Sequence, residues 1–191
     1  MDGDVEKFIK NSKSISVKTA FDFMLQTAKG LGYMHCSIKG GKKPIFHGDL
    51  AVRNLLLQKD ESKPSGYVIK VADFGKSVSA TKKFEQTYSA DTEVDMEAMN
   101  PWRWMPVELF QGGRINAESD IWSYGVTSWE IFAGGRVPYA GMVNFQNLLR
   151  NGYRLPRPSD SPMSIYIISK LYEHTAAAFD LKYKNVKKTL F

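Results

Sequence analysis

The sequence predicts an α+β fold that is mainly helical and carries one small β-hairpin. Two segments, residues 17–35 and 116–132, repeat apolar residues every three or four positions, which is typical of amphipathic helices. Between them, residues 55–58 and 67–72 read as two short strands joined by a turn rich in charged residues, proline and glycine. At 191 residues the chain has the length of one domain and can bury a core.

Composition excludes several classes of protein. The net charge is +6, but the lysines are scattered and are not interleaved with aromatic residues, so we expect a solvated surface and no nucleic-acid interface. No apolar run approaches the roughly 20 residues of a membrane span. The single cysteine, Cys36, rules out an intramolecular disulfide and fits a reducing compartment. We therefore expect a cytoplasmic protein with no membrane segment in this chain.

The first third of the chain predicts two helices and a turn. Residues 4–10 form a short helix, and residues 17–35 form a long one that Ser16 caps. Residues 37–43 contain two glycines and three lysines but lack the G-x-x-x-x-G-K-[ST] pattern, so they predict a surface turn and not a phosphate loop. We expect the buried stripe of the long helix to be Val17, Ala20, Phe21, Met24, Ala28, Leu31 and Met34.

The residues that carry chemistry surround the predicted hairpin. His47, Asp49 and Asn54 form an H-x-D-x-x-x-x-N pattern before it, and Asp73 begins a D-F-G pattern directly after it. Phosphoryl transfer needs a carboxylate that orients the attacking hydroxyl, together with oxygen ligands that hold Mg²⁺ against the phosphates. In these patterns and their order, the chain resembles the C-terminal lobe of a protein kinase of the tyrosine type.

The resemblance implies a role for each of these side chains. Asp49 would be the catalytic base and Arg53 would assist the transferring phosphate, while Asn54 and Asp73 would bind Mg²⁺ and, through it, ATP. His47 would have a structural role beneath the phenylalanine of the D-F-G pattern. Structural support is further expected from Phe74, Gly75, Glu108 and Asp120.

The resemblance places the activation loop between the D-F-G pattern and the motif that contains Glu108. It would comprise residues 76–100, whose single tyrosine, Tyr88, is a possible phosphorylation site. Residues 101–110 resemble the run that closes this loop in tyrosine kinases, with Pro101 as a platform for the substrate tyrosine. Gly48 stands where most kinases have the arginine that pairs with a phosphorylated loop, so we expect weak control by a Tyr88 phosphate.

The resemblance continues through the second long helix. Asp120 stands in its S-D-x-W-S-Y-G pattern, where kinases have a carboxylate that accepts hydrogen bonds from catalytic-loop amides. Residues 164–172 predict a further apolar helix. We therefore expect a kinase lobe at residues 1–172 and a tail at residues 173–191 that does not match the family.

The identity of the acceptor can be argued from the catalytic loop. Serine/threonine kinases place a lysine two residues after the catalytic aspartate, whereas this position is Ala51 here and the cation stands at Arg53. That arrangement is the tyrosine-kinase form. The resemblance thus implies ATP- and Mg²⁺-dependent phosphorylation of tyrosine in a protein substrate.

Two other functions stay open. Gly48 makes the catalytic pattern H-G-D-L-x-x-x-N, as in small-molecule phosphotransferases of the aminoglycoside and choline kinase type, although the downstream motifs argue against them. No glycine-rich loop or V-A-I-K lysine precedes residue 47. We therefore expect this chain alone to transfer phosphate poorly. The second alternative is a catalytically inactive, truncated kinase-like module that binds a peptide or another kinase.

Overall fold

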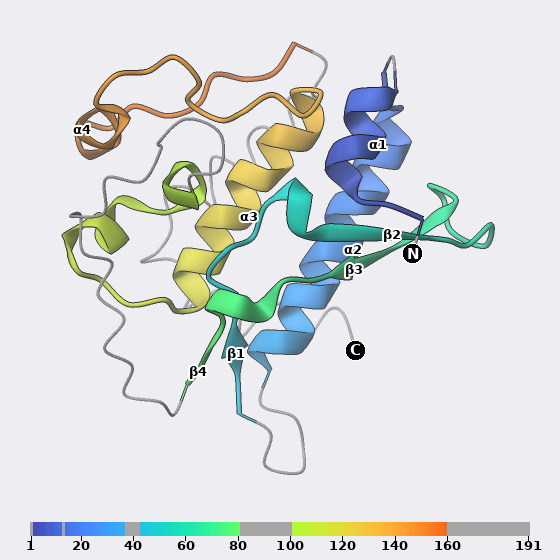
Figure 1. Ribbon diagram of the computed structural model, residues 1–191, viewed down its shortest axis with the longest axis horizontal. Helices are drawn as coiled ribbons and strands as arrows, with labels where there is room; N and C mark the ends of the chain where they lie inside the picture. The colour runs from blue at the N-terminus through green and yellow to red at the C-terminus, as the bar shows by residue number, and fades with distance from the viewer. Residues whose placement is uncertain (1, 13, 37–42, 81–100, 160–191) are drawn as a thin grey trace.

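Two long helices form the centre of the molecule. The structure is a computed structural model, and it describes residues 2–12, 14–36, 43–80 and 101–159. Helices α2 (Val17–His35) and α3 (Ala117–Phe132) pack side by side, and a β-hairpin lies against α2 (Figure 1). The remaining helices and strands are α1 (Val5–Asn11), β1 (Ile45–Phe46), β2 (Leu55–Lys59), β3 (Tyr67–Val71), β4 (Val78–Ser79) and α4 (Phe145–Arg150). Four short 3-10 helices complete the set: η1 (Val52–Asn54), η2 (Phe74–Lys76), η3 (Pro101–Trp104) and η4 (Val107–Gln111).

The three helices predicted from periodicity begin at side-chain caps. Asp4 accepts a hydrogen bond from the Lys7 amide at 2.8 Å at the start of α1. Ser16 accepts one from the Thr19 amide at 3.0 Å at the start of α2, as predicted. Asn116 caps α3 through a reciprocal capping box with its third residue. Each cap satisfies an amide that has no partner within its helix, which fixes where the helix begins.

The buried face of α2 differs from the predicted stripe. Val17 and Phe21 are 47% and 48% exposed, whereas Phe23 and Thr27 are buried. Asp22, next to Phe23, is buried as well, and its Oδ2 accepts a hydrogen bond from the Ser65 amide in the hairpin turn at 3.1 Å. The prediction was wrong for Val17 and Phe21 because α2 directs Asp22 and the adjacent Phe23 toward the hairpin. Val17 and Phe21 are exposed as a result.

The hairpin pairs β2 with β3 in a regular antiparallel register. Leu55 pairs with Val71 and Lys59 pairs with Tyr67, and Leu55 and Leu57 face the core. Pairing at this end continues one residue further, since the Ala72 amide donates to the Asn54 carbonyl oxygen at 2.9 Å. The residues just before β2 and just after β3 are thereby brought together.

A second, smaller sheet was not predicted. Strands β1 and β4 pair antiparallel, with Ile45 opposite Ser79 and Phe46 opposite Val78. Strands of two residues are too short to show an alternating pattern. β4 lies within residues 76–100, where the sequence shows no periodicity, and its pairing with β1 ties both flanks of the site together.

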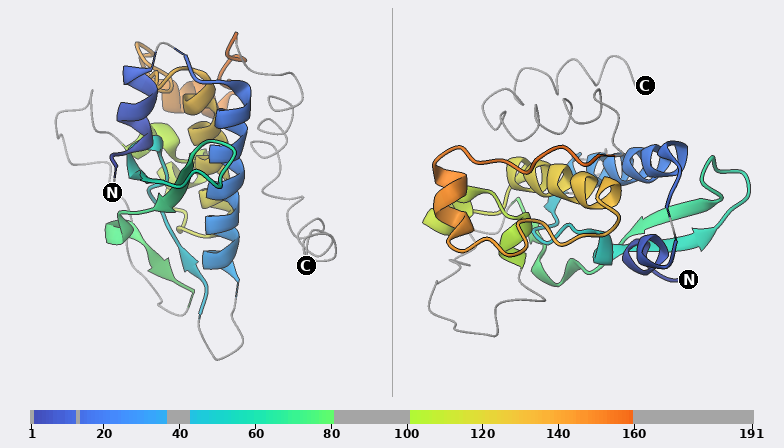
Figure 2. Two further views of the ribbon diagram at one scale, coloured as in Figure 1. Left: turned by 90° about the vertical axis from the view of Figure 1, so that its right-hand side faces the viewer. Right: turned by 90° about the horizontal axis from the view of Figure 1, so that it is seen from above.

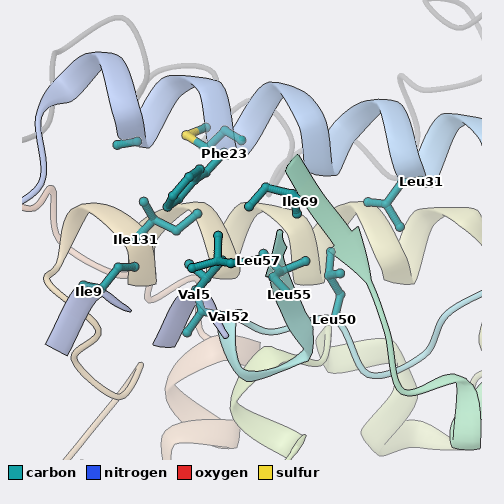
Figure 3. Close-up of a cluster of buried hydrophobic side chains, with 12 residues drawn as sticks. Val5, Ile9, Phe23, Leu31, Leu50, Val52, Leu55, Leu57, Ile69 and Ile131 are labelled. Carbon is teal, nitrogen blue, oxygen red and sulfur yellow. The ribbon is translucent and has the colours of Figure 1, made fainter. Parts of the chain in front are cut away.

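Helix α3 contributes to two hydrophobic cores. One core joins α1, α2, the hairpin and the C-terminal end of α3 (Figure 3). The other joins α3 to α4 and to the residues around η3. The first core contains Val5, Ile9, Phe23, Leu31, Leu50, Val52, Leu55, Leu57, Ile69 and Ile131, and the second contains Ala51, Trp104, Trp122, Val126, Tyr139, Leu149 and Leu155.

The outer elements and the C-terminal residues complete the description of the fold. Helix α4 and the hairpin lie at opposite ends of the molecule in two perpendicular views (Figures 1 and 2). None of the described helices is long and apolar enough to cross a membrane. The helix predicted at residues 164–172 lies outside the described residues.

Candidate active site

The loop between β1 and β2 is held by a buried aspartate on α3. Asp120 is fully buried, and its carboxylate accepts hydrogen bonds from the amides of His47 at 2.7 Å and Gly48 at 2.8 Å. The Nε2 atom of His35 lies 2.8 Å from the same carboxylate. A buried carboxylate is costly unless donors surround it, and these three contacts both compensate its burial and fix the start of the loop.

Asp49 lies on this loop between two cations. It is 8% exposed. Its Oδ1 lies 2.6 Å from Arg53 Nη2, and its Oδ2 lies 3.0 Å from Lys76 Nζ. The Arg53 guanidinium stacks over the ring of Trp104, 4.6 Å from the ring centroid. Lys76 was not singled out in the sequence, because only the fold brings it within reach of Asp49.

His47 uses both ring nitrogens in internal hydrogen bonds. Nδ1 accepts from the Asp49 amide at 3.2 Å, and Nε2 is 2.9 Å from the Ala72 carbonyl oxygen, so this network assigns the ring proton to Nε2. The ring lies 5.3 Å from that of Phe74, centroid to centroid. His47 thus links the catalytic loop to the D-F-G turn and has no nitrogen left for proton transfer.

Asn54 and Asp73 are the candidate metal ligands, and the hairpin brings them close. Asn54 Nδ2 donates to the Asp49 carbonyl oxygen at 2.7 Å, which leaves the amide oxygen of Asn54 available to a cation. Asp73 has a left-handed backbone with φ of 62°, and it is exposed, with Oδ1 3.3 Å from the Gly75 amide. The residue before it, Ala72, bonds to both Asn54 and His47.

This donor set fits Mg²⁺ bound together with phosphates. Within the described residues, no group of three or more His, Cys, Asp and Glu side chains could hold a metal ion. One amide oxygen and one carboxylate are instead what Mg²⁺ takes when nucleotide phosphates and water fill its other positions.

Glu130 is a functional candidate that sequence reasoning missed. It is buried on α3, and its Oε2 accepts hydrogen bonds from the Val52 amide at 3.2 Å and from Trp104 Nε1 at 2.9 Å. Burial raises the pKa of the Glu130 carboxyl to about 7, against the lowering effect of these two donors and of Arg53. A glutamate on the buried side of an apolar helix was the signal that could have identified it.

The other predicted residues are less closely connected to this cluster. The Glu108 side chain is exposed, and in the described part of the chain it forms no ion pair. Pro101 begins η3, but its side chain is not among those described. Tyr88 lies outside the described residues.

Comparison with known proteins identifies the family of the chain. The chain matches the family described as protein tyrosine and serine/threonine kinase over residues 1–187, and it therefore belongs to that family. This match runs past residue 172, where the resemblance read from the sequence ended, and the boundary at residue 172 stays a prediction.

The curated relatives include proteins named as tyrosine-protein kinases and as growth factor receptors. The chain is 35% identical to the tyrosine-protein kinase transmembrane receptor Ror of Drosophila melanogaster over 172 residues, which are 86% of this chain and 22% of Ror. It is 33% identical to the mast/stem cell growth factor receptor Kit of Takifugu rubripes over 172 residues, 88% of this chain and 16% of Kit. It is 29% identical to human tyrosine-protein kinase FRK over 170 residues, 87% of this chain and 30% of FRK. The chain thus spans less than a third of the length of each of these relatives.

Proposed function

We propose that the chain carries the phosphoryl-transfer site of a protein tyrosine kinase and forms the C-terminal lobe of its catalytic domain. The observation that carries this proposal is the convergence of Asp49, Asn54 and the D-F-G turn at one end of the hairpin. The Asn54 amide bonds to Asp49, the Asn54 carbonyl bonds to Ala72, and Lys76 in the D-F-G turn reaches the Asp49 carboxylate.

The chemistry follows from the position of these groups. The hydroxyl of a substrate tyrosine attacks the γ-phosphorus of ATP, the bond from that phosphorus to the bridging oxygen breaks, ADP leaves, and Asp49 takes the hydroxyl proton. Asn54 and Asp73 would hold Mg²⁺, which would supply neutralisation of phosphate charge. Arg53 keeps Asp49 oriented through its 2.6 Å contact and is itself held on Trp104.

Tyrosine is the proposed acceptor for two reasons. Ala51 is fully buried and offers no cation, so the catalytic loop's own positive charge beside Asp49 comes from Arg53, as in the tyrosine-kinase form, while Lys76 contacts Asp49 from the D-F-G turn. Two of the curated relatives, Ror and FRK, are tyrosine-protein kinases by name. The cytoplasmic location and the absence of nucleic-acid binding stay predictions.

A transfer assay tests the proposal. The purified chain is incubated with Mg²⁺, radiolabelled ATP and either a tyrosine peptide or a serine peptide of otherwise equal sequence. Since this chain alone is expected to transfer phosphate poorly, we expect slow labelling of the tyrosine peptide alone. The rate for Asp49→Asn should be lower by about 100-fold or more, because the general base is removed. Asp60→Asn, in the turn at the far end of the hairpin, is the matched control and should keep the wild-type rate.

Nucleotide binding separates the outcomes. If Mg·ATP raises the melting temperature of the wild-type chain but not that of Asp73→Asn, and neither peptide is labelled, the chain is a nucleotide-binding module without transfer activity. If neither labelling nor a shift occurs, the proposed function is wrong for this chain.

A further inference from the structure

The charges around Asp49 do not balance. Arg53 and Lys76 each contact one oxygen of the same carboxylate, at 2.6 and 3.0 Å. In the described part of the chain, neither cation bonds to a second carboxylate. Two cations therefore share the single carboxylate of Asp49, which favours a further anion beside them.

The two cations are held differently. The Arg53 side chain is 26% exposed and its guanidinium stacks on Trp104. The Lys76 side chain is 38% exposed, and its ammonium forms an ion pair with Asp49. A lysine ammonium on a four-carbon stem can turn to a new partner while its backbone stays fixed.

The backbone of Lys76 is fixed by its approach to Gly48. Gly48 has φ of +76°, and a Cβ added there would lie 3.0 Å from the Lys76 carbonyl oxygen and 2.7 Å from Ile115 Cδ1. A Cβ at position 48 would crowd both neighbours, and the positive φ also favours glycine, so the glycine eases the close approach of the D-F-G turn to the catalytic loop. The glycine at position 48 and the position of Lys76 are thus parts of one arrangement.

We propose that Lys76 binds the γ-phosphate of the nucleotide during transfer, an inference that rests on the proposed function. The attacking hydroxyl must lie within about 3 Å of Asp49, so the phosphorus that it attacks is close to the same carboxylate. An ammonium 3.0 Å from Asp49 Oδ2 therefore reaches a γ-phosphate oxygen by rotation of its stem. Lys76 stays protonated throughout, while the hydroxyl proton goes to Asp49.

This movement would also prepare the base. While Lys76 is paired with Oδ2, a substrate hydroxyl must compete with the ammonium for that oxygen. Transfer of the ammonium to the γ-phosphate frees Oδ2 when a triphosphate is present and leaves it covered when only a diphosphate is bound. Lys76 thereby distinguishes ATP from ADP.

Calorimetric binding of two nucleotides tests the role of Lys76 without any turnover. The chain is titrated in Mg²⁺ with the non-hydrolysable triphosphate AMP-PNP and with ADP. We expect Lys76→Gln to weaken AMP-PNP binding by about 10-fold, the value of a charge-assisted hydrogen bond, and to change ADP binding by less than about twofold. Lys76→Arg should restore most of the preference for the triphosphate.

A second lysine of the same hairpin region provides the control. Lys70 is exposed on β3, and Lys70→Gln removes the same charge without touching Asp49. It should leave both affinities unchanged, and melting curves establish that all variants are folded.

The result distinguishes failure of this inference from failure of the proposed function. If the wild-type chain binds both nucleotides and Lys76→Gln weakens both equally, or neither, then Lys76 is only an internal ion-pair partner and the proposed function survives. If the wild-type chain binds neither nucleotide, the proposed function and this inference fall together.

Discussion

The catalytic loop is anchored at its two ends by two buried carboxylates of α3, and the anchors differ. At the start of the loop, Asp120 has two backbone amides and a histidine nitrogen within 2.8 Å. At the other end, Glu130 has one backbone amide at 3.2 Å and one indole nitrogen at 2.9 Å, both on the same oxygen. Both side chains lie within the buried part of α3.

The difference shows how the number of donors decides what a buried carboxylate can do. Fewer and longer hydrogen bonds at Glu130 leave burial as the dominant effect, and burial raises the pKa of its carboxyl to about 7. The Glu130 end of the loop is therefore sensitive to protonation near neutral pH. The Asp120 end is instead a rigid attachment, in which each oxygen of the carboxylate meets at least one donor.

The largest expected effect comes from breaking the Asp120 anchor. In Asp120→Asn, either orientation of the amide turns its NH₂ group toward a backbone N–H of the loop, so at least one buried donor loses its acceptor. We expect the free energy of unfolding, measured in urea, to fall by about 3 kcal/mol. Glu118→Gln, in the first turn of the same helix, is the control and should cost less than about 1 kcal/mol. A loss as small for Asp120→Asn as for the control would remove the distinction between the anchors.

The Glu130 anchor is tested by the dependence of stability on pH. The folded-state pKa of about 7 lies above the ordinary value of 4.5, so the folded chain binds more protons between these values and its stability falls as pH rises through this window. Glu130→Gln resembles the protonated form and lacks this dependence. Relative to wild type, we expect the variant to gain roughly 2 to 3 kcal/mol of unfolding free energy between pH 4.5 and pH 8.

Urea unfolding at several pH values measures this gain. Wild type and Glu118→Gln should show parallel curves, because Glu118 is not among the buried residues of α3. A difference between wild type and Glu130→Gln that does not change with pH would contradict the raised pKa.

A smaller effect is expected from replacing Gly48, the glycine of the loop whose amide bonds to Asp120. Gly48 and Gly66 have φ of +76° and +79°, but a Cβ at Gly48 would meet Ile115 and Lys76, whereas a Cβ at Gly66 would meet nothing within 4 Å. Gly66→Ala should therefore cost about 1 kcal/mol from backbone strain alone, and Gly48→Ala about 2 kcal/mol. Urea unfolding of the two variants gives the difference. Equal losses would mean that the D-F-G turn does not press on the catalytic loop.

Local signals predicted the helices and the hairpin. Helices α1, α2 and α3 begin at Asp4, Ser16 and Asn116, whose side chains cap the first turn whatever lies nearby. Periodicity did not predict the orientation of α2, because Asp22 turns toward Ser65, 43 residues further along the chain. Short strands β1 and β4 carried no pattern at all and exist through their pairing.

The candidate site likewise contains residues that sequence motifs identify and residues that only tertiary contacts identify. The motif residues could be found in the sequence because phosphoryl transfer needs a small set of side chains in a fixed order. The position of Glu130 on an apolar helix could mark it as a candidate, but its role and that of Lys76 could not be assigned from the sequence, because both depend on neighbours that are distant in the chain. Their neighbours are Val52 and Trp104 for Glu130, and Asp49 for Lys76.

By itself, the sequence determined the helices, the hairpin and the identity of the residues that would perform the chemistry. These follow from interactions between residues close in the chain and from side-chain chemistry that is the same in any surroundings. Only the tertiary structure decided which charges meet at Asp49 and how firmly α3 holds each end of the loop. Burial and the distances between groups far apart in sequence set the energies of those contacts, and both come into being only when the chain packs.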